Sequence, residues 1–168
     1  MKLRYRTAVL DDLDEIMRLV SAAICEMKRL QIDQWDAEYP TRADFEEDIR
    51  RKTLVIGLSG TEIAVIYALN QDCDEQYANA DWAYRGTAYA VLHRLCVLPA
   101  MQRQGIARET LMYMEAELRQ RGYQALRLDV FSENPYALRL YRKDGFYETG
   151  IAEWRKGRFL LMEKLLYA

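Results

Sequence analysis

Cysteine, proline and histidine are scarce in this chain of 168 residues, which has three cysteines, three prolines and one histidine. Because Cys25, Cys73 and Cys96 are odd in number and form no Cys-x-x-Cys pair, we expect a reduced, cytoplasmic protein without a disulfide framework or a metal. No stretch rich in proline, glycine or serine marks a linker, and neither a signal peptide nor a membrane span is evident. We therefore expect one soluble domain over residues 1–168 that does not bind membranes.

Charge of one sign is also not in excess. Lysine and arginine total 24 and aspartate and glutamate total 26, which gives a net charge of −2. A nucleic-acid-binding domain ordinarily presents a concentrated basic face, so no nucleic-acid partner is expected. Hydrophobic residues make up 51% of the chain, and a chain of this length can bury an ordinary globular core.

Apolar periodicity predicts an alternation of strands and helices. Strands are expected over residues 3–9, 54–58, 63–69, 91–98, 125–131, 146–154 and 158–166. Helices are expected after a cap at Asp11 or Asp12, after a capping box at Thr41 and Asp44, over 105–120, and from Pro135 to just before Gly145. Residues 31–40 and 70–89 remain as irregular segments, and the second is long enough to cover a site. This order predicts an α/β (α+β) fold with a mixed central sheet of about six or seven strands flanked by about four helices.

The segment that joins the fourth expected strand to the third helix contains Gly105 and the small residue Ala107. A helix start presents unpaired backbone N–H groups and the positive end of a dipole, and this setting attracts a phosphate. Gly105 would let the backbone approach that phosphate closely, and Arg103 and Arg108 could add charge-assisted hydrogen bonds. The Gly-Lys-Ser/Thr of a Walker motif is missing, and a plain strand-to-helix turn with surface arginines explains the pattern equally well.

Two motifs in the C-terminal half resemble one family. Gln102-x-x-Gly105-x-Ala107 is similar to the Gln/Arg-x-x-Gly-x-Gly/Ala signature of the GCN5-related N-acetyltransferases (GNAT). The stretch from Asn134 to Phe146 is similar to the family's Asn-x-x-Ala-x-x-Leu-Tyr-x-Lys-x-Gly-Phe block. The resemblance covers residues 91–150. It implies a single GNAT domain and an acetyl-CoA-dependent N-acetyltransferase, which moves an acetyl group to a primary amine in a ternary complex.

The resemblance also implies which residues bind acetyl-CoA. The backbone of the glycine-containing loop would hold the pyrophosphate, and this loop comprises Gln102, Arg103, Gln104, Gly105, Ile106, Ala107 and Arg108. The preceding strand would pair with the pantetheine arm through Leu95, Cys96 and Val97. Asn134 would contact the pantetheine or an ordered water. Its amide could also cap the helix that follows, and both roles can hold together.

The chemistry requires a proton donor for the departing thiolate and an acceptor for the amine proton. The resemblance assigns the donor role to Tyr141, because a phenol stays protonated at neutral pH; a purely structural aromatic is the alternative. His93 lies in the strand beside the expected thioester site, and a similar histidine helps to remove the amine proton in arylalkylamine acetyltransferases. A cross-strand histidine with no role explains it equally well, and Glu62 and Glu153 are weaker candidates for the base.

A covalent route through the Cys96 thiol is conceivable in principle. Strand alternation places Cys96 and His93 on opposite faces, however, so His93 would not serve as the base for the thiol. A buried cysteine that packs as a small hydrophobic residue is the simpler interpretation.

The two irregular segments are rich in aromatic and acidic residues that suit a cationic amine, small molecule or peptide. The aromatic residues are Trp35, Tyr39, Tyr77, Trp82, Tyr84 and Tyr89. The alternative is that they pin down the loops. The segment Gln34-Trp35-Asp-x-x-Tyr39-Pro40 resembles a segment of bacterial members of the family, and it does not identify the acceptor.

A non-catalytic acyl-CoA-binding or sensor module of the same fold is the other function to consider. The last hairpin could pair across a homodimer.

Overall fold

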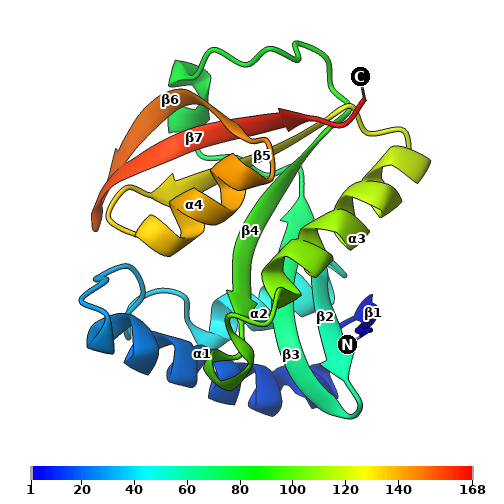
Figure 1. The fold of residues 1–168 in the computed structure, drawn as a ribbon, viewed down its shortest axis with the longest axis vertical. Helices are drawn as coiled ribbons and strands as arrows, with labels where there is room; N and C mark the ends of the chain where they lie inside the picture. Colours follow the sequence, from blue (N-terminus) through cyan, green and yellow to red (C-terminus); the bar gives the residue numbers. More distant parts are fainter. Residues whose placement is uncertain (1, 168) are drawn as a thin grey trace. The chain divides into compact units, whose positions relative to one another are not determined.

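The computed structural model describes residues 2–167 and contains four α-helices and seven strands among them (Figure 1). The elements are β1 Arg4–Thr7, α1 Leu13–Arg29, α2 Arg42–Arg50, β2 Leu54–Ser59, β3 Glu62–Asn70, β4 Tyr89–Val97, α3 Ile106–Gln120, β5 Ala125–Phe131, α4 Pro135–Lys143, β6 Tyr147–Trp154 and β7 Gly157–Leu165. The strand order is β1-β2-β3-β4-β5-β7-β6; β4 runs parallel to β5, and β7 lies between β5 and β6 and pairs antiparallel with both. The predicted mixed sheet with flanking helices is confirmed.

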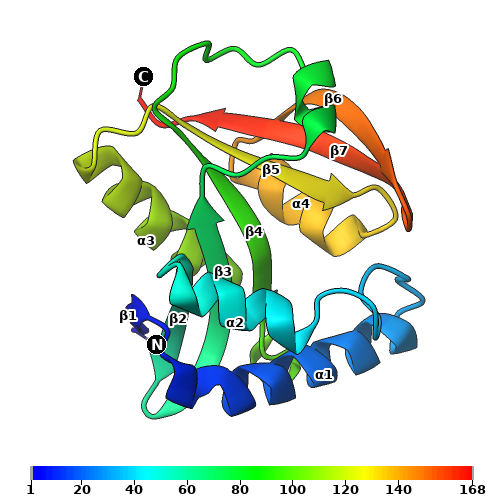
Figure 2. The ribbon, with the colours of Figure 1, turned by 180° about the vertical axis from the view of Figure 1, so that it is seen from behind.

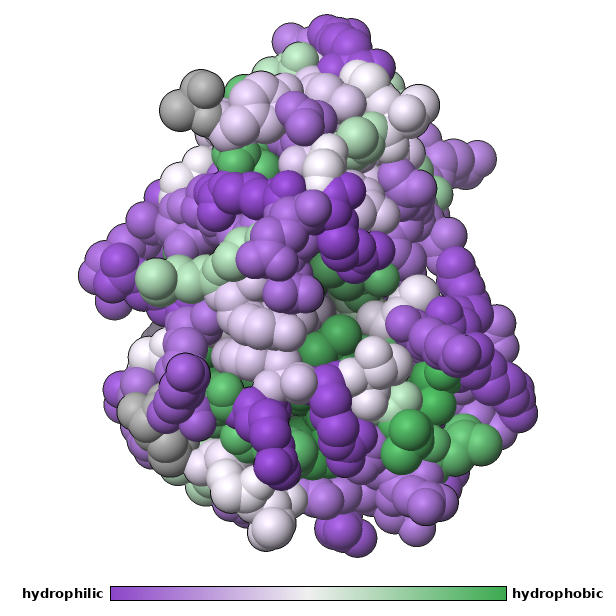
Figure 3. Space-filling model, turned by 90° about the vertical axis from the view of Figure 1, so that its right-hand side faces the viewer, coloured by the Kyte–Doolittle hydropathy of each residue, from purple (hydrophilic) through white to green (hydrophobic). Residues whose placement is uncertain are grey.

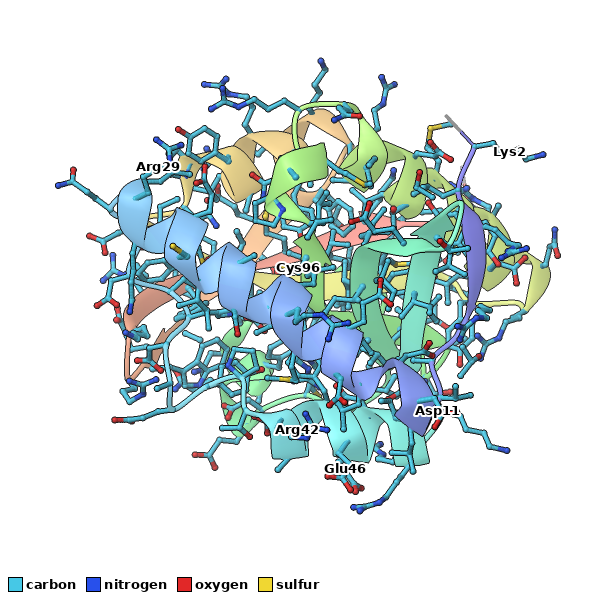
Figure 4. All side chains as sticks on the ribbon, turned by 90° about the horizontal axis from the view of Figure 1, so that it is seen from below. Lys2, Asp11, Arg29, Arg42, Glu46 and Cys96 are labelled. Carbon is cyan, nitrogen blue, oxygen red and sulfur yellow. The ribbon has the colours of Figure 1, made fainter. Side chains whose placement is uncertain are left out.

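The chain divides into two compact units, and the first contains the residues up to Leu69 together with Arg94–Thr110. In this unit β2 pairs antiparallel with both β1 and β3, and α1 and α2 pack against the strands (Figure 2). The amphipathic α1 buries Ile16 and Val20, and α2 buries Phe45 and Ile49 in the same apolar core. Cys96 belongs to this core as well, and Figure 4 shows it on the β4 strand behind α1.

The second unit contains Asn70–His93 and the chain from Leu111 onward. Its sheet is built on β5, whose seven residues pair with β7 from Ala125↔Leu165 to Phe131↔Phe159. Helix α4 packs against β5, and the 3₁₀ turn Glu75–Asn79 (η2) packs against β6 (Figures 1 and 2). The segment 70–88 is therefore an ordered layer on the sheet, with a helical turn that the sequence pattern did not predict.

Local capping explains where several helices begin. Thr41 accepts a hydrogen bond from the Asp44 amide, and the Asp44 carboxylate accepts one from the Thr41 amide, so the predicted capping box is confirmed. The side-chain cap of α1 expected from Asp11 or Asp12 is not formed. The turn Leu10–Asp12 (η1) precedes α1, and the Asp12 carboxylate instead accepts the Val9 amide of that turn and pairs with Arg6.

Segment 70–88 is attached to the strands by side-chain amides. The Gln76 amide donates to the Glu153 carbonyl at 2.7 Å and accepts from the Glu153 N–H at 2.8 Å, so it imitates a neighbouring strand beside β6. Gln71 donates to the carbonyls of Thr87 and Tyr89 and closes the base of the segment. These bonds satisfy backbone groups that a β-ladder would otherwise satisfy.

The three cysteines are free thiols, and only Cys96 is buried. Within residues 2–167 no cluster of His, Cys, Asp and Glu has the arrangement of a metal site. None of the helices in that range combines the length and apolar character needed to cross a membrane. Hydrophilic residues predominate on the face shown in Figure 3, with hydrophobic residues in smaller patches between them.

Candidate active site

The loop before α3 contains two residues with a left-handed backbone. Gly105 lies at φ +83°, and a Cβ built there would have no heavy atom within 4 Å. Arg103 also has a positive φ of 62°, so two left-handed residues, separated by Gln104, precede the helix. Alternation of right- and left-handed residues turns successive backbone N–H groups toward one side and forms a concave anion site. The positive φ favours glycine at residue 105, and the space over its α-carbon is open.

Helix α3 begins directly after this loop. The first hydrogen bond of the helix runs from the Glu109 amide to the Gly105 carbonyl at 3.0 Å. The amides of Ile106, Ala107 and Arg108 come before it and have no acceptor within the helix, as is usual for the first turn. Ile106 is buried and packs with Leu3, Ala64 and Val65, so the first turn is fixed in place. Such a helix start, with unpaired amides and the positive end of a dipole, is the setting that ordinarily attracts an anion.

Two glutamines of the loop have structural contacts of their own. The Gln102 amide donates to the Val97 carbonyl at 3.3 Å, and the Gln104 amide lies 3.5 Å from the Ala100 carbonyl. These bonds close the turn that contains the short helix Pro99–Met101 (η3). A side chain at these positions thus shapes the loop, whereas phosphate binding at the same residues would use the backbone.

The strand that precedes the loop contains Leu95, Cys96 and Val97. Cys96 is buried among apolar side chains of α1, β2 and β3, and burial raises the pKa of its thiol to about 12. The thiol is therefore protonated at neutral pH and is a poor nucleophile. This geometry favours the interpretation of Cys96 as a packing residue.

His93 forms a hydrogen bond with Asn70 at the end of β3. Its Nε2 atom lies 2.8 Å from the Asn70 Oδ1 atom, which also accepts the Asp72 amide at 2.9 Å. Because Oδ1 can only accept, Nε2 carries a proton, and Nδ1 is the proton-accepting nitrogen of the neutral ring. The predicted base thus has a fixed tautomer. Glu153, one weaker candidate, pairs with Arg158 at the surface, and Glu62 is exposed at the start of β3.

Tyr141 lies on α4, whose first turn is capped by the Asn134 side chain accepting the Ala137 amide at 3.1 Å. The capping role of Asn134 is therefore observed. The Tyr141 residue is 8% exposed, and its ring packs edge-on against Phe146 at 5.6 Å between centroids. The Tyr141 hydroxyl has no hydrogen-bond partner among residues 2–167. Every side-chain N or O atom in that range that is fully buried does have a partner. The Tyr141 hydroxyl is therefore not fully buried.

The pKa of Tyr141 is raised far above that of an ordinary phenol. Burial is the largest cause, and the negative charge of Asp129 on β5 adds to it. A phenol with a raised pKa keeps its proton across the physiological range, as a general acid must. Tyr141 therefore combines a buried ring, a hydroxyl without a partner in the described chain, and a protonated state.

Asp129 was not predicted from the sequence, although β5 contains the signal. Arg127 and Asp129 are charged residues two apart in an otherwise apolar strand, and a strand points such residues to the same face. The Asp129 Oδ2 atom accepts the Tyr77 hydroxyl at 2.7 Å. Tyr77 is buried, and burial followed by the charge of Asp129 raises its pKa well above the ordinary value. A carboxylate thus lies in the same unit as Tyr141 and influences it electrostatically.

Most of the aromatic residues proposed for the acceptor have partners within the protein. The Arg127 guanidinium lies 4.4 Å from the Trp82 ring and 4.1 Å from the Tyr89 ring, so the cation these rings contact belongs to the chain itself. Trp35 is buried in the core of the first unit. Of the six aromatic residues, Tyr39 is the one counted among the exposed large hydrophobic side chains, at 40%. The loop-pinning interpretation therefore holds for Trp35, Tyr77, Trp82 and Tyr89.

Arg127 and Glu163 form a buried ion pair at the centre of these contacts. The Glu163 side chain is 0% exposed and accepts Arg127 Nε at 3.0 Å and the Tyr147 hydroxyl at 2.9 Å. It also accepts the amides of Ala83 and Tyr84, while the Arg127 guanidinium donates to the Tyr84 carbonyl. One carboxylate thus ties β7, β5 and segment 80–84 together, and its hydrogen-bonding capacity is filled by the protein.

Comparison with known proteins identifies one family. The family model described as the acetyltransferase (GNAT) family matches residues 22–146. No curated protein matches the sequence.

Solved structures give the same fold. A GNAT-family acetyltransferase from Streptococcus agalactiae superposes with a TM-score of 0.86 at 23% identity, over 97% of this chain and 95% of that one. A protein from Staphylococcus aureus described as an acetyltransferase has a TM-score of 0.77 at 28% identity, over 97% and 99%. The PaiA N-acetyltransferase from Thermoplasma acidophilum, solved with coenzyme A, has a TM-score of 0.73 at 18% identity, over 98% and 99%.

Proposed function

Because this chain belongs to the acetyltransferase (GNAT) family, we propose that residues 1–168 form one acetyl-CoA-dependent N-acetyltransferase domain that acetylates a primary amine. The observation that carries the proposal is the loop at the start of α3. There the left-handed Gly105, with open space over its α-carbon, presents the first amides of the helix to an anion. The presence of a tyrosine with a raised pKa in the same chain supports transfer over simple binding.

Different segments of the chain would bind different parts of acetyl-CoA. The backbone of residues 102–108 would hold the pyrophosphate, and Arg103 and Arg108 would add charge from the surface. The backbone of Leu95, Cys96 and Val97 would pair with the pantetheine arm as an additional strand. Asn134 would serve mainly as the cap of α4, which orients Tyr141 two turns further along the helix.

The proposed transfer is a direct attack in a ternary complex. The amine nitrogen attacks the thioester carbon, its proton passes to the imidazole of His93 directly or through a water, and a C–N bond forms. The C–S bond then breaks, and the Tyr141 hydroxyl gives its proton to the departing sulfur. The proton lost by the amine and the proton gained by the thiolate balance, and solvent restores His93 and Tyr141 to their starting states.

The proposed acceptor is a small-molecule or peptide amine, in a cytoplasmic setting that the three free thiols favour. The direct test is the release of free coenzyme A thiol from acetyl-CoA with polyamines, amino sugars, aralkylamines and peptides that have free amino termini. Turnover with at least one amine, lost in Tyr141→Phe, supports the proposal. Tight coenzyme A binding without turnover on the whole panel would contradict it and would favour an acyl-CoA sensor.

A further inference from the structure

Arg94 has an unusual backbone for its position. Four non-glycine residues in the described chain have a positive φ, and Gln31, Lys52 and Arg103 lie in turns, whereas Arg94 lies inside strand β4 with φ 55°. A left-handed residue within a strand is disfavoured for any side chain with a Cβ, and it persists only where the surroundings enforce it. An outlier of this kind, next to residues proposed to bind a substrate, points to a positioning role.

Hydrogen bonds of the Arg94 side chain hold this backbone conformation in place. Its Nε and Nη2 atoms donate to the two carboxylate oxygens of Asp48 at 2.8 and 2.7 Å, in a bidentate pair. The Arg94 and Asp48 side chains are only 13% and 5% exposed. The third guanidinium nitrogen donates to the Tyr39 hydroxyl at 2.8 Å. Each nitrogen therefore has a partner, and the backbone of β4 is tied at this point to α2 and to the segment before it.

Asp48 is held equally firmly. It lies on α2 beside the core residues Phe45 and Ile49, and the Thr53 amide and hydroxyl bond its carbonyl. Neither end of the pair can move without displacing packed structure. A buried ion pair is not in itself an efficient source of stability, because desolvation offsets much of the attraction. The pair does fix one geometry, since a guanidinium fork and a carboxylate match in only a few orientations.

We propose that Arg94 is a positioning residue for coenzyme binding: its pair with Asp48 holds the left-handed turn in β4 and so directs the backbone groups of Leu95, Cys96 and Val97. This inference rests on the proposed function, in which these three residues receive the pantetheine arm. Release of the turn to extended backbone would rotate the peptide group between Arg94 and Leu95. The strand after it would then present its donors and acceptors in a different direction.

Two double variants separate the backbone from the ion pair. Asp48→Asn/Arg94→Asn and Asp48→Asn/Arg94→Val both remove the two charges, so neither leaves a buried charge alone. They differ at position 94, because asparagine tolerates the left-handed region and a β-branched residue opposes it. Calorimetric titration with coenzyme A should give a weaker Kd for both variants than for the wild type, because the ion pair that holds the turn is gone. The valine variant should be weaker than the asparagine variant by about a further tenfold, as the cost of a left-handed L-residue implies. Melting temperatures confirm that both proteins are folded.

Asp14→Asn is the matched control, because it removes a carboxylate from the Arg42–Asp14 pair, which is exposed and also joins α1 to α2. Its Kd for coenzyme A should equal that of the wild type. Kd values of both double variants equal to that of the wild type would overturn the proposal for Arg94 while leaving the acetyltransferase assignment intact. A wild-type protein that fails to bind coenzyme A would overturn the proposed function and this inference together.

Discussion

The Nε2 atom of His93 and the Oδ1 atom of Asn70 lie 2.8 Å apart, and this contact decides which nitrogen of the ring accepts a proton. The Asn70 oxygen is identified by its second bond, from the Asp72 amide. Asn70 lies at the end of β3 and His93 lies in β4, so 23 positions separate the two residues along the chain. A base with a fixed tautomer acts from one side of its ring only.

Replacement of His93 by glutamine tests its role as the base. An imidazole accepts a proton only while it is neutral, so kcat/KM should fall on the acidic side of the pH profile. His93→Gln should lower kcat/KM by roughly 10²-fold or more and remove this limb from the pH profile. Asn70→Ala should keep the limb and lower the rate less, because it frees the tautomer without removing the base. An unchanged limb in His93→Gln would assign the base to another group.

Tyr141→Phe deletes the proposed proton donor and keeps the ring on Phe146. Loss of a general acid ordinarily costs a factor of roughly 10²–10⁴ in rate, so kcat should fall within that range. Coenzyme A affinity should change little, because one hydrogen bond contributes only about 0.5–1.5 kcal/mol. Steady-state assays and calorimetry on the same preparation measure the two quantities. A variant that retains near-full kcat with the best acceptor would make Tyr141 a structural residue.

The raised pKa of Tyr141 gives a prediction for alkaline pH. An acid whose pKa is raised keeps its proton to higher pH, so deprotonation of Tyr141 should not lower kcat below pH ~10, the ordinary value of a phenol. Asp129→Asn removes the smaller of the two causes of the shift and should move the alkaline limb of kcat to lower pH. The profile is measured to the highest pH at which the protein stays folded. A limb of the wild type near pH ~8 that disappears in Tyr141→Phe would contradict this expectation, since such a limb requires a lowered pKa.

Gly105→Val tests the phosphate site with a matched glycine. Gly105 and Gly122 have φ values of +83° and +81°, and at both positions an added Cβ would have no heavy atom within 4 Å. The two valine substitutions therefore impose the same backbone strain, and only the first fills the space proposed for the pyrophosphate. Coenzyme A should raise the melting temperature of Gly122→Val by mass action and leave that of Gly105→Val unchanged. An equal rise in both variants would refute the loop assignment.

Glu163→Ala tests the buried anchor of segment 80–84. The substitution leaves the Arg127 charge without its buried partner, and the loss of one member of such a pair typically costs about 3–5 kcal/mol of unfolding free energy. Glu153→Ala is the control, because the Glu153–Arg158 pair is more than half exposed and should change stability by at most ~1 kcal/mol. Urea unfolding at neutral pH measures both. Similar losses in the two variants would show that the Glu163 contacts do not stabilise the segment.

The sequence alone determined which helices and strands form and in what order. Hydrophobic periodicity located all seven strands and four helices, because the period of a helix or strand depends on a single segment. The capping box at Thr41 and the Asn134 cap were predictable for the same reason. Each involves residues at most three positions apart, and their physics is that of a short peptide.

The tertiary structure alone decided which polar groups meet. Arg94 and Asp48 are 46 positions apart, Tyr77 and Asp129 are 52 apart, and Arg127 and Glu163 are 36 apart. Hydrophobic periodicity predicts which face of its element each residue lies on and whether it is buried. Which partner it meets depends on the strand order and on the path of segment 70–88. The roles of Arg94 and Asp129 were therefore not visible in the sequence. A charge can be buried only where another element brings its counter-charge, and that pairing is a property of the folded chain.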